Sequence, residues 1–260
     1  MERAMWSAVT GMKAQELSLD MIANNLSNIN TTSFKGSRAN FQDLLYTVLR
    51  SPGATSGEGQ VPGGIQVGHG TRVAGISKTF EQGPLVQTDN PLDIAVAGDG
   101  FFEVTLPDGT LAYTRDGSFR LSSGGEVVTT DGYRVSGFDT IEAGTTEITI
   151  SPDGALSTVV NGTQVSKGRL TLVRFVNPEG LRSIGKNLYK ETEASGSAQT
   201  GLMPGTSGVG SLNQRYLESS NINAAEELVN MITTQRAYEA TSKVIRASDE
   251  MMSMANRLTG

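Results

Sequence analysis

Residues 223–258, at the C-terminal end of the chain, read NAAEELVNMITTQRAYEATSKVIRASDEMMSMANRL, and this stretch decides the fold. Met231, Tyr238, Ile245 and Met252 lie seven residues apart in this stretch, among residues that favour a helix. A seven-residue apolar spacing is typical of a narrow seam at which one helix packs against another. The stretch therefore predicts a long C-terminal helix with one apolar seam.

The N-terminal end repeats this spacing with Met5, Met12, Leu19 and Leu26. The pattern predicts a helix over about residues 3–29, roughly 40 Å long. Because the two helices lie at opposite ends of the chain, we expect them to pair as a coiled-coil-like domain. The residues predicted to carry helix packing and self-assembly are Met5, Val9, Met12, Leu19, Ile22, Leu26, Leu228, Met231, Ile232, Tyr238, Ile245 and Met252.

The inner ends of both helices carry clear boundary signals. Asn28, Asn30 and Thr31 belong to a polar cluster whose side chains compete for backbone hydrogen bonds, so the first helix should end there. Asn223 is a favourable N-cap, and Glu226 and Glu227 complement the positive end of the second helix.

Between about residues 71 and 189 the apolar period changes to two, which indicates strands. Asp-Gly pairs follow several of these runs, and this dipeptide favours type I′ hairpin turns in which both residues have positive φ. Gly98-Asp99-Gly100 lacks the third glycine of a nucleotide-binding turn and is interpreted as another hairpin. The predicted fold class is α+β, with paired terminal helices and a central antiparallel β-rich module.

Two Gly-rich stretches flank the β-rich module. Residues 51–70 predict an irregular loop or extended arm, residues 195–210 are similar in composition, and residues 41–49 fit either a helix or an extended strand. The predicted domains are a helical domain of residues 1–35 and 217–260, a connecting region of residues 36–72 and 190–216, and an outer β domain of residues 73–189.

Composition excludes several classes of protein. The chain has 260 residues, 31 glycines and 18% charged residues, which favours a turn-rich β protein over a helical bundle. Its net charge of −6, with scattered Lys and Arg, argues against a nucleic-acid partner. The absence of cysteine excludes disulfides and thiolate zinc sites. No apolar run is long enough to predict a membrane span or a cleavable signal peptide.

Residues able to support catalysis are few. His69 is the only histidine, so a metal site built from two or more histidines cannot form, and because His69 lies in a Gly-rich loop we expect its side chain to be exposed. Asn161 begins a weak glycosylation pattern. The carboxylates that could form an acid/base pair are Asp89, Asp93, Asp99 and Glu103. Because Asp is common in turns for backbone reasons, we predict no catalytic site, no cofactor and no metal.

Residues 23–35 read ANNLSNINTTSFK and residues 226–243 read EELVNMITTQRAYEATSK. Both segments closely resemble the terminal signatures of the bacterial flagellar rod and hook axial protein family. Residues 98–102 and 113–119 resemble the β-module motifs of that family. Ser33 stands where the family usually carries Gly, a residue suited to positive φ. The matching signature residues are Asn24, Asn25, Asn28, Asn30, Thr31, Phe34, Lys35, Gln235 and Arg236.

Within the family, the chain length and residues 43–46, 50–54 and 187–189 look most like the distal-rod members. The resemblance implies a structural subunit, not an enzyme, in a helical tubular drive shaft that transmits torque across the periplasm. It also implies export through the flagellar type III apparatus without signal cleavage. The implied partners are further copies of the chain, proximal rod and hook proteins, and the outer ring bushing proteins. Residues 51–70 would then form an inter-subunit arm that stiffens the rod.

Three alternatives remain at this point. The chain could be a proximal rod or hook subunit of the same family. It could instead be a secreted β-rich polysaccharide hydrolase that uses the carboxylates of residues 89–103, or a monomeric adhesin or binding module.

Overall fold

The computed structural model describes residues 2–50, 55–56, 59–60, 63–142, 145–160, 162–206 and 208–259. Parts of the predicted 51–70 loop, and Asn161 of the glycosylation pattern, lie outside the described residues. The chain forms two compact units. We call Met1–Ser27, Ser37–Ser77 and Asn223–Gly260 the helical unit, and Asn28–Gly36 with Lys78–Ile222 the β unit.

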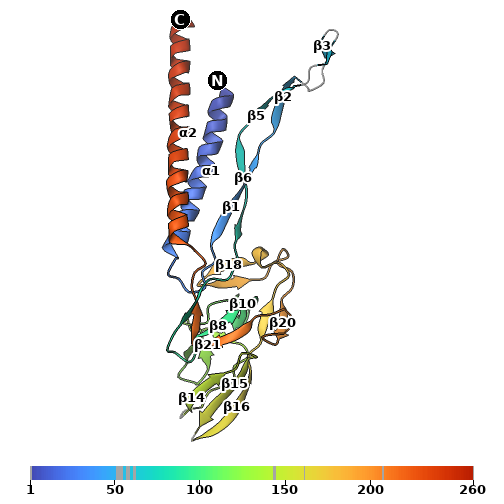
Figure 1. Ribbon diagram of the computed structural model, residues 1–260, viewed down its shortest axis with the longest axis vertical. Helices are drawn as coiled ribbons and strands as arrows, with labels where there is room; N and C mark the ends of the chain where they lie inside the picture. The colour runs from blue at the N-terminus through green and yellow to red at the C-terminus, as the bar shows by residue number, and fades with distance from the viewer. Residues whose placement is uncertain are drawn as a thin grey trace. The chain divides into compact units, whose positions relative to one another are not determined.

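Two long helices make up most of the helical unit. α1 spans Glu2–Ser27 and α2 spans Ala224–Thr259, close to the predicted bounds. The helices contact each other, and Figure 1 shows the N- and C-termini at the same end of this antiparallel pair. Asn223 caps α2 as predicted, because its Oδ1 accepts a hydrogen bond from the backbone N–H of Ala225 at 3.1 Å. Within the described ranges, no helix has the length and apolarity needed to cross a bilayer.

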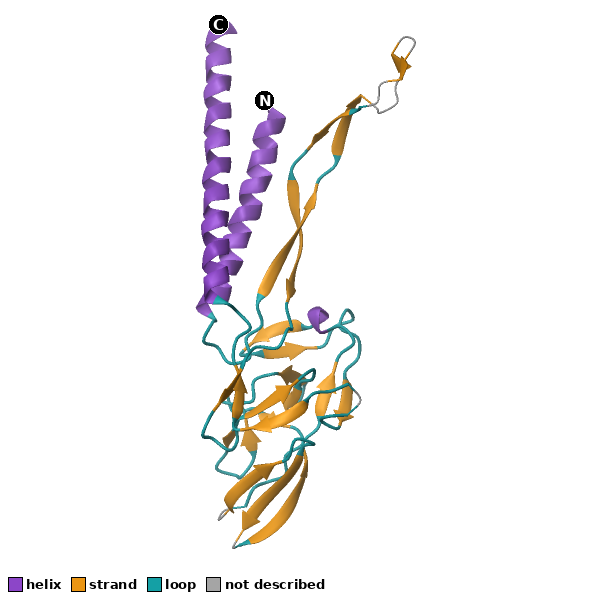
Figure 2. Cartoon of the chain, in the orientation of Figure 1, coloured by secondary structure: helices purple, strands orange, loops and turns teal. Residues whose placement is uncertain are grey.

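The same unit contains a two-stranded ribbon, residues 37–77, which we call the arm. Three strand pairs follow one another along this ribbon, which is drawn in orange in Figure 2. The pairs are β1 (Ser37–Asp43) with β6 (Thr71–Lys78), β2 (Tyr46–Arg50) with β5 (Ile65–Gly68), and β3 (Thr55–Ser56) with β4 (Gly59–Gln60). Residues 41–49 are therefore extended and not helical, and residues 65–68 form a strand instead of an irregular loop.

The β unit is built around a seven-stranded antiparallel sheet in the order β11-β12-β13-β9-β10-β19-β18. Its strands are β9 (Phe102–Thr105), β10 (Leu111–Thr114), β11 (Arg120–Leu121), β12 (Val127–Val128), β13 (Arg134–Val135), β18 (Arg182–Gly185) and β19 (Leu188–Lys190). The predicted central antiparallel β-rich module is confirmed.

Smaller sheets complete the unit. A three-stranded meander contains β14 (Thr145–Ile150), β15 (Ala155–Val160) and β16 (Thr163–Arg169). Three further pairs are β17 (Leu172–Arg174) with β20 (Gln199–Leu202), β8 (Ile94–Ala97) with β21 (Ser211–Gln214), and β7 (Leu85–Gln87) with β22 (Tyr216–Glu218). A short 3-10 helix spans Pro178–Gly180.

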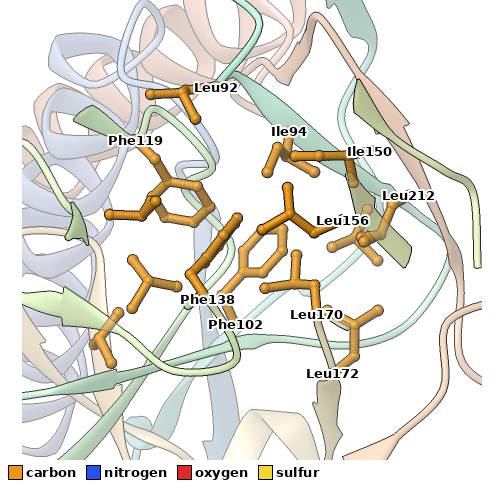
Figure 3. Close-up of a cluster of buried hydrophobic side chains, with 14 of the residues drawn as sticks. Leu92, Ile94, Phe102, Phe119, Phe138, Ile150, Leu156, Leu170, Leu172 and Leu212 are labelled. Carbon is orange, nitrogen blue, oxygen red and sulfur yellow. The ribbon is translucent and has the colours of Figure 1, made fainter. Parts of the chain in front are cut away.

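The core of the β unit is a cluster of aliphatic and aromatic side chains. Figure 3 shows Phe102 and Phe119 at its centre, and their rings meet edge to face with centroids 5.1 Å apart. Ile94 of β8, Leu172 of β17 and Leu170, which lies between β16 and β17, are also buried in this cluster. Burying a side chain of this size stabilises a fold by about 1.5–3 kcal/mol. The β unit therefore has a core of its own.

Two predictions about turns are wrong. Gly98-Asp99-Gly100 does not form a hairpin, because β8 before it pairs with β21, whereas β9 after it pairs with β10 and β13. Asp108-Gly109 is not a type I′ turn, since Gly109 has positive φ and Asp108 does not. The Gly109 N–H donates a hydrogen bond to the Leu106 carbonyl, and the Leu106 N–H donates one to the Thr110 carbonyl. This pattern is a type I turn followed by a glycine bulge.

Candidate assembly surfaces and a buried charged cluster

One side of α2 is covered and follows the predicted seven-residue spacing. Met231, Ile245 and Met252 are half-buried there, and Tyr238 lies at the edge of the covered side. Residues midway between them are small and polar: Thr234, Thr241 and Ser248, of which Ser248 is buried. The Thr241 hydroxyl donates to the Ala237 carbonyl one turn back at 2.8 Å. The seam thus alternates apolar and small hydroxyl residues, a feature that the apolar pattern alone did not reveal.

The predicted seam residues of α1 are all at least partly covered. Ile22 is buried, and the half-buried set is Met5, Val9, Met12, Leu19 and Leu26. α1 contacts both α2 and β1, so its covered surface is wider than a single stripe. In contrast, Leu228 and Ile232 of α2 are 47% and 50% exposed.

A second apolar stripe on α2 is exposed, on a different side from the seam. It has two groups, Val229 with Ile232 and Val244 with Met251 and Met254, and the exposed Arg236 and Lys243 lie between the groups; we call the five apolar residues the outer stripe. On α1, Trp6 is 64% exposed although it is the only tryptophan in the chain. Exposed apolar side chains on one side of a helix make that side a candidate surface for contact with another protein.

Asn25 joins three segments of the helical unit. Its side-chain amide donates to the Ser37 carbonyl at 3.0 Å and to a Glu227 carboxylate oxygen at 3.1 Å. Its Oδ1 accepts a hydrogen bond from the Ser37 N–H at 3.0 Å. Asn25 itself is buried, and its partners Ser37 and Glu227 are half-buried. This single side chain fixes the end of α1 to the starts of β1 and α2.

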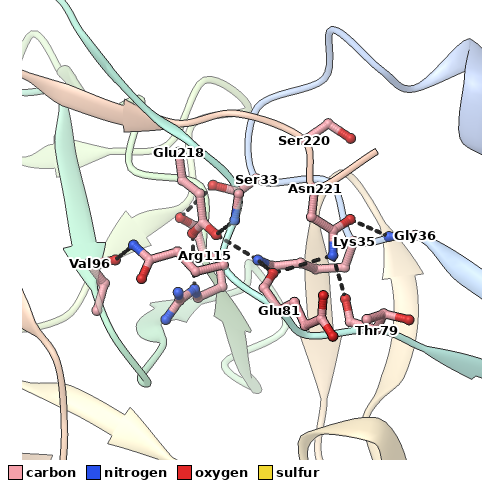
Figure 4. A network of polar contacts seen from close by, with 12 residues as sticks. Ser33, Lys35, Gly36, Thr79, Glu81, Val96, Arg115, Glu218, Ser220 and Asn221 are labelled. Carbon is pink, nitrogen blue, oxygen red and sulfur yellow. Dashed lines mark hydrogen bonds and ion pairs between the residues drawn. The ribbon is translucent and has the colours of Figure 1, made fainter. Parts of the chain in front are cut away.

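A cluster of three buried charged residues lies in the β unit (Figure 4). Both carboxylate oxygens of Glu218 are paired, one with Lys35 Nζ at 2.6 Å and the other with Arg115 Nε at 3.2 Å. The Lys35 and Glu218 side chains have no exposed surface. We call these three residues the charged cluster. It joins residues 28–36, which follow α1, to the strand β22 that precedes α2.

Further bonds complete the charged cluster. Lys35 also donates to the Glu81 carbonyl at 2.7 Å, and Arg115 Nη1 donates to the Gly98 and Gly100 carbonyls at 2.7 and 2.6 Å. Burial lowers the pKa of Lys35 below its ordinary value, and the Glu218 carboxylate opposes that effect. One carboxylate thus balances two cations in a region from which water is excluded.

Comparisons with known proteins identify the family. Residues 5–35 match the family described as flagella basal body rod protein, residues 95–158 the flagellar hook protein FlgE/F/G D1 domain, and residues 213–258 the flagellar basal body rod FlgEFG protein C-terminal family. The flagellar basal-body rod protein FlgG of Borreliella burgdorferi is 47% identical over 99% of both chains. The FlgG protein of Bacillus subtilis is 37% identical over 97% of both chains. The chain belongs to the FlgG family of flagellar basal-body rod proteins.

As a FlgG-family protein, the chain is a structural rod subunit and not an enzyme. The predicted family, the distal-rod type and the structural role are confirmed. The match to a solved structure, Helicobacter pylori flagellar hook protein FlgE2, spans 71% of this chain and 43% of the FlgE2 chain, with 12% sequence identity. The TM-score of this match is 0.24.

The FlgG-family signature residues divide between the two units. Asn25 belongs to the junction described above, and Lys35 belongs to the charged cluster. Ser33 has φ 55, a conformation that favours Gly, and its hydroxyl donates to the Arg115 carbonyl at 2.8 Å. The remaining signature residues are the exposed Asn24, Asn30, Gln235 and Arg236 and the half-buried Asn28, Thr31 and Phe34.

Residues that the sequence offered for catalysis or metal binding form structural contacts instead. Asp93 is buried and accepts a hydrogen bond from the Asn90 amide at 2.7 Å, as in a turn. The prediction that His69 is exposed is wrong. Its side chain is half-buried, and Nε2 lies 2.7 Å from the Thr47 hydroxyl oxygen. Across the described ranges, no group of three or more His, Asp or Glu residues could hold a metal ion.

The charged cluster leads to a prediction about alkaline pH. Burial, with a smaller contribution from Glu218, raises the pKa of Tyr189 from 10 to about 12. Because the pKa of Tyr189 is higher in the folded than in the unfolded state, deprotonation of its hydroxyl destabilises the fold. The stability that depends on the neutral hydroxyl is complete below pH 10 and is lost between about pH 10 and 12. We expect the free energy of unfolding to fall by about 2–3 kcal/mol over that range. Urea unfolding at pH 9, 10, 11 and 12 measures it.

Tyr189→Phe is the matched variant, and it should reduce this fall. Burial also raises the pKa of Tyr113 to about 12, so part of the pH dependence should remain in the variant. Equal pH dependence of the two proteins would contradict the assignment to Tyr189.

Proposed function

We propose that the chain self-assembles through its terminal helices into the helical tubular distal rod, a drive shaft that transmits torque from the motor to the hook. The observation that carries the proposal is the outer stripe of α2, together with Trp6 of α1. These side chains remain exposed after α1 and α2 have packed on each other. Two helices with apolar surface on more than one side need further cover, and neighbouring copies supply it.

The seam residues and the outer stripe then have different roles. In this proposal Met231, Ile245 and Met252 pair α2 with α1 in a coiled-coil-like manner within one subunit. Leu228 and Ile232, which are half exposed, contact adjacent subunits. We further propose that the two helices line the inner wall of the tube.

The arm is the second assembly element in the proposal. A two-stranded ribbon is at most marginally stable alone in water, and this one exposes apolar side chains near its outer strands. Leu45 is 86% exposed and Leu49 is 60% exposed. An adjacent subunit that covers the arm would explain both features and would stiffen the rod.

The remaining partners follow from membership of the family. We propose that the assembled subunits contact the proximal rod and hook proteins at the two ends of the distal rod, and the ring bushing proteins around it. The rod would then span the periplasm, which the subunits reach through the flagellar export apparatus. These contacts require exposed surface of the β unit.

Polymerisation of the purified full-length chain tests the function. We expect tubes in electron micrographs, and a shift of Trp6 fluorescence to shorter wavelength as the side chain becomes buried. Leu228→Asp or Tyr238→Asp should leave the β unit folded and block polymerisation. A chain that stays monomeric at high concentration would favour the alternative of a monomeric adhesin or binding module.

Deletion of Pro52–Gly68 tests the arm. We expect rods that are less straight and bend more easily, because contacts between adjacent subunits are lost along the whole length of the tube. Curvature measured in electron micrographs of isolated rods provides the result. Rods of unchanged straightness and stiffness would contradict the role of the arm.

A further inference from the structure

The strand pairs β1–β6 and β2–β5 of the arm are separated by a short break, between residues 43 and 46 on one side of the ribbon and residues 68 and 71 on the other. There the Leu44 N–H donates to the Gly70 carbonyl at 2.9 Å, and the His69 N–H donates to the Leu45 carbonyl at 3.2 Å. β1 and β6 lie between this point and the base of the arm at residues 37 and 77, and β2 and β5 lie beyond it. We call β2 and β5 the outer arm.

At this point the backbone of the arm lies directly against α1. A Cβ atom on Gly70 would collide with Thr10 Oγ1 and would lie 3.2 Å from Ser7 Cα. Gly70 also has φ +108, which L-residues rarely adopt. The Thr10 hydroxyl donates to the Ser7 carbonyl at 2.9 Å, and the Thr71 N–H points to the same hydroxyl at 3.4 Å. Ser7, Thr10 and Gly70 thus form a tight contact, which we call the notch.

Other glycines of the arm lack this environment. A Cβ atom on Gly63 or on Gly75 would meet no atom within 4 Å, and neither glycine has positive φ. Gly75 lies on the same strand, β6, that begins directly after Gly70. A Cβ atom on Gly68 would meet the Tyr46 ring of the paired strand at 3.2 Å, so among the arm glycines whose surroundings are described only Gly70 lies against α1.

Among the described residues of the arm, hydrogen bonds to α1 occur at two points, and the notch is the second. The first is Asn25, which forms two hydrogen bonds with Ser37 at the start of β1. Asn25 and Thr10 are separated by about 22 Å along the helix at 1.5 Å per residue. Two fixed points on one helix define the direction of the ribbon, whereas one would leave it free to pivot.

We propose that Gly70, with Ser7 and Thr10, is a positioning site that holds the outer arm at a fixed angle to α1, so that its exposed apolar side chains meet a second copy of the chain. This inference rests on the proposed function, because the second copy is the adjacent rod subunit. The outer arm supplies the contact surface, and the notch supplies its direction.

Distances measured by pulsed electron spin resonance test the positioning. Because the chain has no cysteine, spin labels can be attached at Lys13→Cys on α1 and Gln66→Cys on β5, both exposed positions. We expect a narrow distance distribution in the otherwise unchanged chain, and one at least twice as broad with Gly70→Ala. Gly75→Ala, the matched control, should leave the distribution narrow.

Polymerisation of the unlabelled variants tests the consequence. Gly70→Ala should raise the critical concentration about tenfold, while Gly75→Ala leaves it unchanged. If Gly70→Ala lowers the helical circular dichroism, Thr10→Leu replaces it, because the larger side chain fills the notch from α1. Thr10→Leu should broaden the distance distribution and raise the critical concentration, whereas Thr10→Ser should do neither. An unchanged distance distribution, or a broadened one with normal polymerisation, would overturn the proposal. Failure of the unmodified chain to polymerise would instead contradict the proposed function, and the distances measured on the monomer would still decide whether the notch fixes the arm.

Discussion

Glu218→Gln is expected to lower the free energy of unfolding of the β unit by about 3–5 kcal/mol, because it leaves two buried cations without an anion. Lys35 and Arg115 share this carboxylate, and the Gly83 N–H also donates to it at 2.9 Å. The neutral amide keeps the shape of Glu218 but not its charge. Urea unfolding of the full chain, followed by the near-ultraviolet circular dichroism of the buried Tyr113 and Tyr189, measures the loss.

Two further variants isolate the buried charge. Glu81→Gln makes the same change at an exposed residue whose carbonyl, not its side chain, accepts a hydrogen bond from Lys35, so it should be nearly neutral. Lys35→Met removes one cation but leaves Glu218 paired with Arg115, and should cost about 1–3 kcal/mol. If Lys35→Met destabilised the β unit as much as Glu218→Gln, the idea that one carboxylate balances two cations would be wrong.

Ile232→Asp is expected to prevent tube formation while leaving the subunit folded. Ile232 is half exposed in the subunit, so the change should cost the isolated chain about 0.5 kcal/mol or less. In the rod the new carboxylate would be buried in an apolar contact, at a cost of about 3 kcal/mol for every copy. That cost corresponds to a critical concentration about 100-fold higher. Light scattering and electron microscopy across a concentration series measure the effect.

The controls separate the outer stripe from the seam. Asn230→Asp adds the same charge at an exposed polar position two residues earlier, and we expect it to polymerise normally. Ile245→Asp changes the covered side of α2, so it should also loosen the helix pair and reduce helical circular dichroism in the monomer. Normal tubes from Ile232→Asp would remove the outer stripe from the proposed contact.

Much of the fold could be predicted from local sequence. The seven-residue spacing and the cap at Asn223 gave both helices to within two residues at each end. Short apolar runs also located most of the central strands. These signals are local, because a helix or strand is recorded in the period of its own residues.

Strand pairing was less predictable. β8 and β9 are adjacent in sequence and separated by a glycine-rich turn, yet β8 pairs with β21, more than a hundred residues later. Gly117 illustrates the cause: a Cβ atom there would collide with the Ile94 carbonyl, so the glycine serves a close backbone approach and not a hairpin. Turn residues indicate that the chain bends, but not which strand it meets afterwards.

By itself, the sequence determined the class of this protein, its two terminal helices and its family, because periodicity and motif residues are properties of neighbouring positions. Only the tertiary structure decided which side of α2 is covered and which stays exposed, and that Lys35, Arg115 and Glu218 share one buried cluster. The notch at Gly70 was likewise hidden, since nothing in a Gly-rich segment indicates which glycine lies against a helix. Burial and charge pairing depend on residues distant in sequence, and those meet only when the chain has folded.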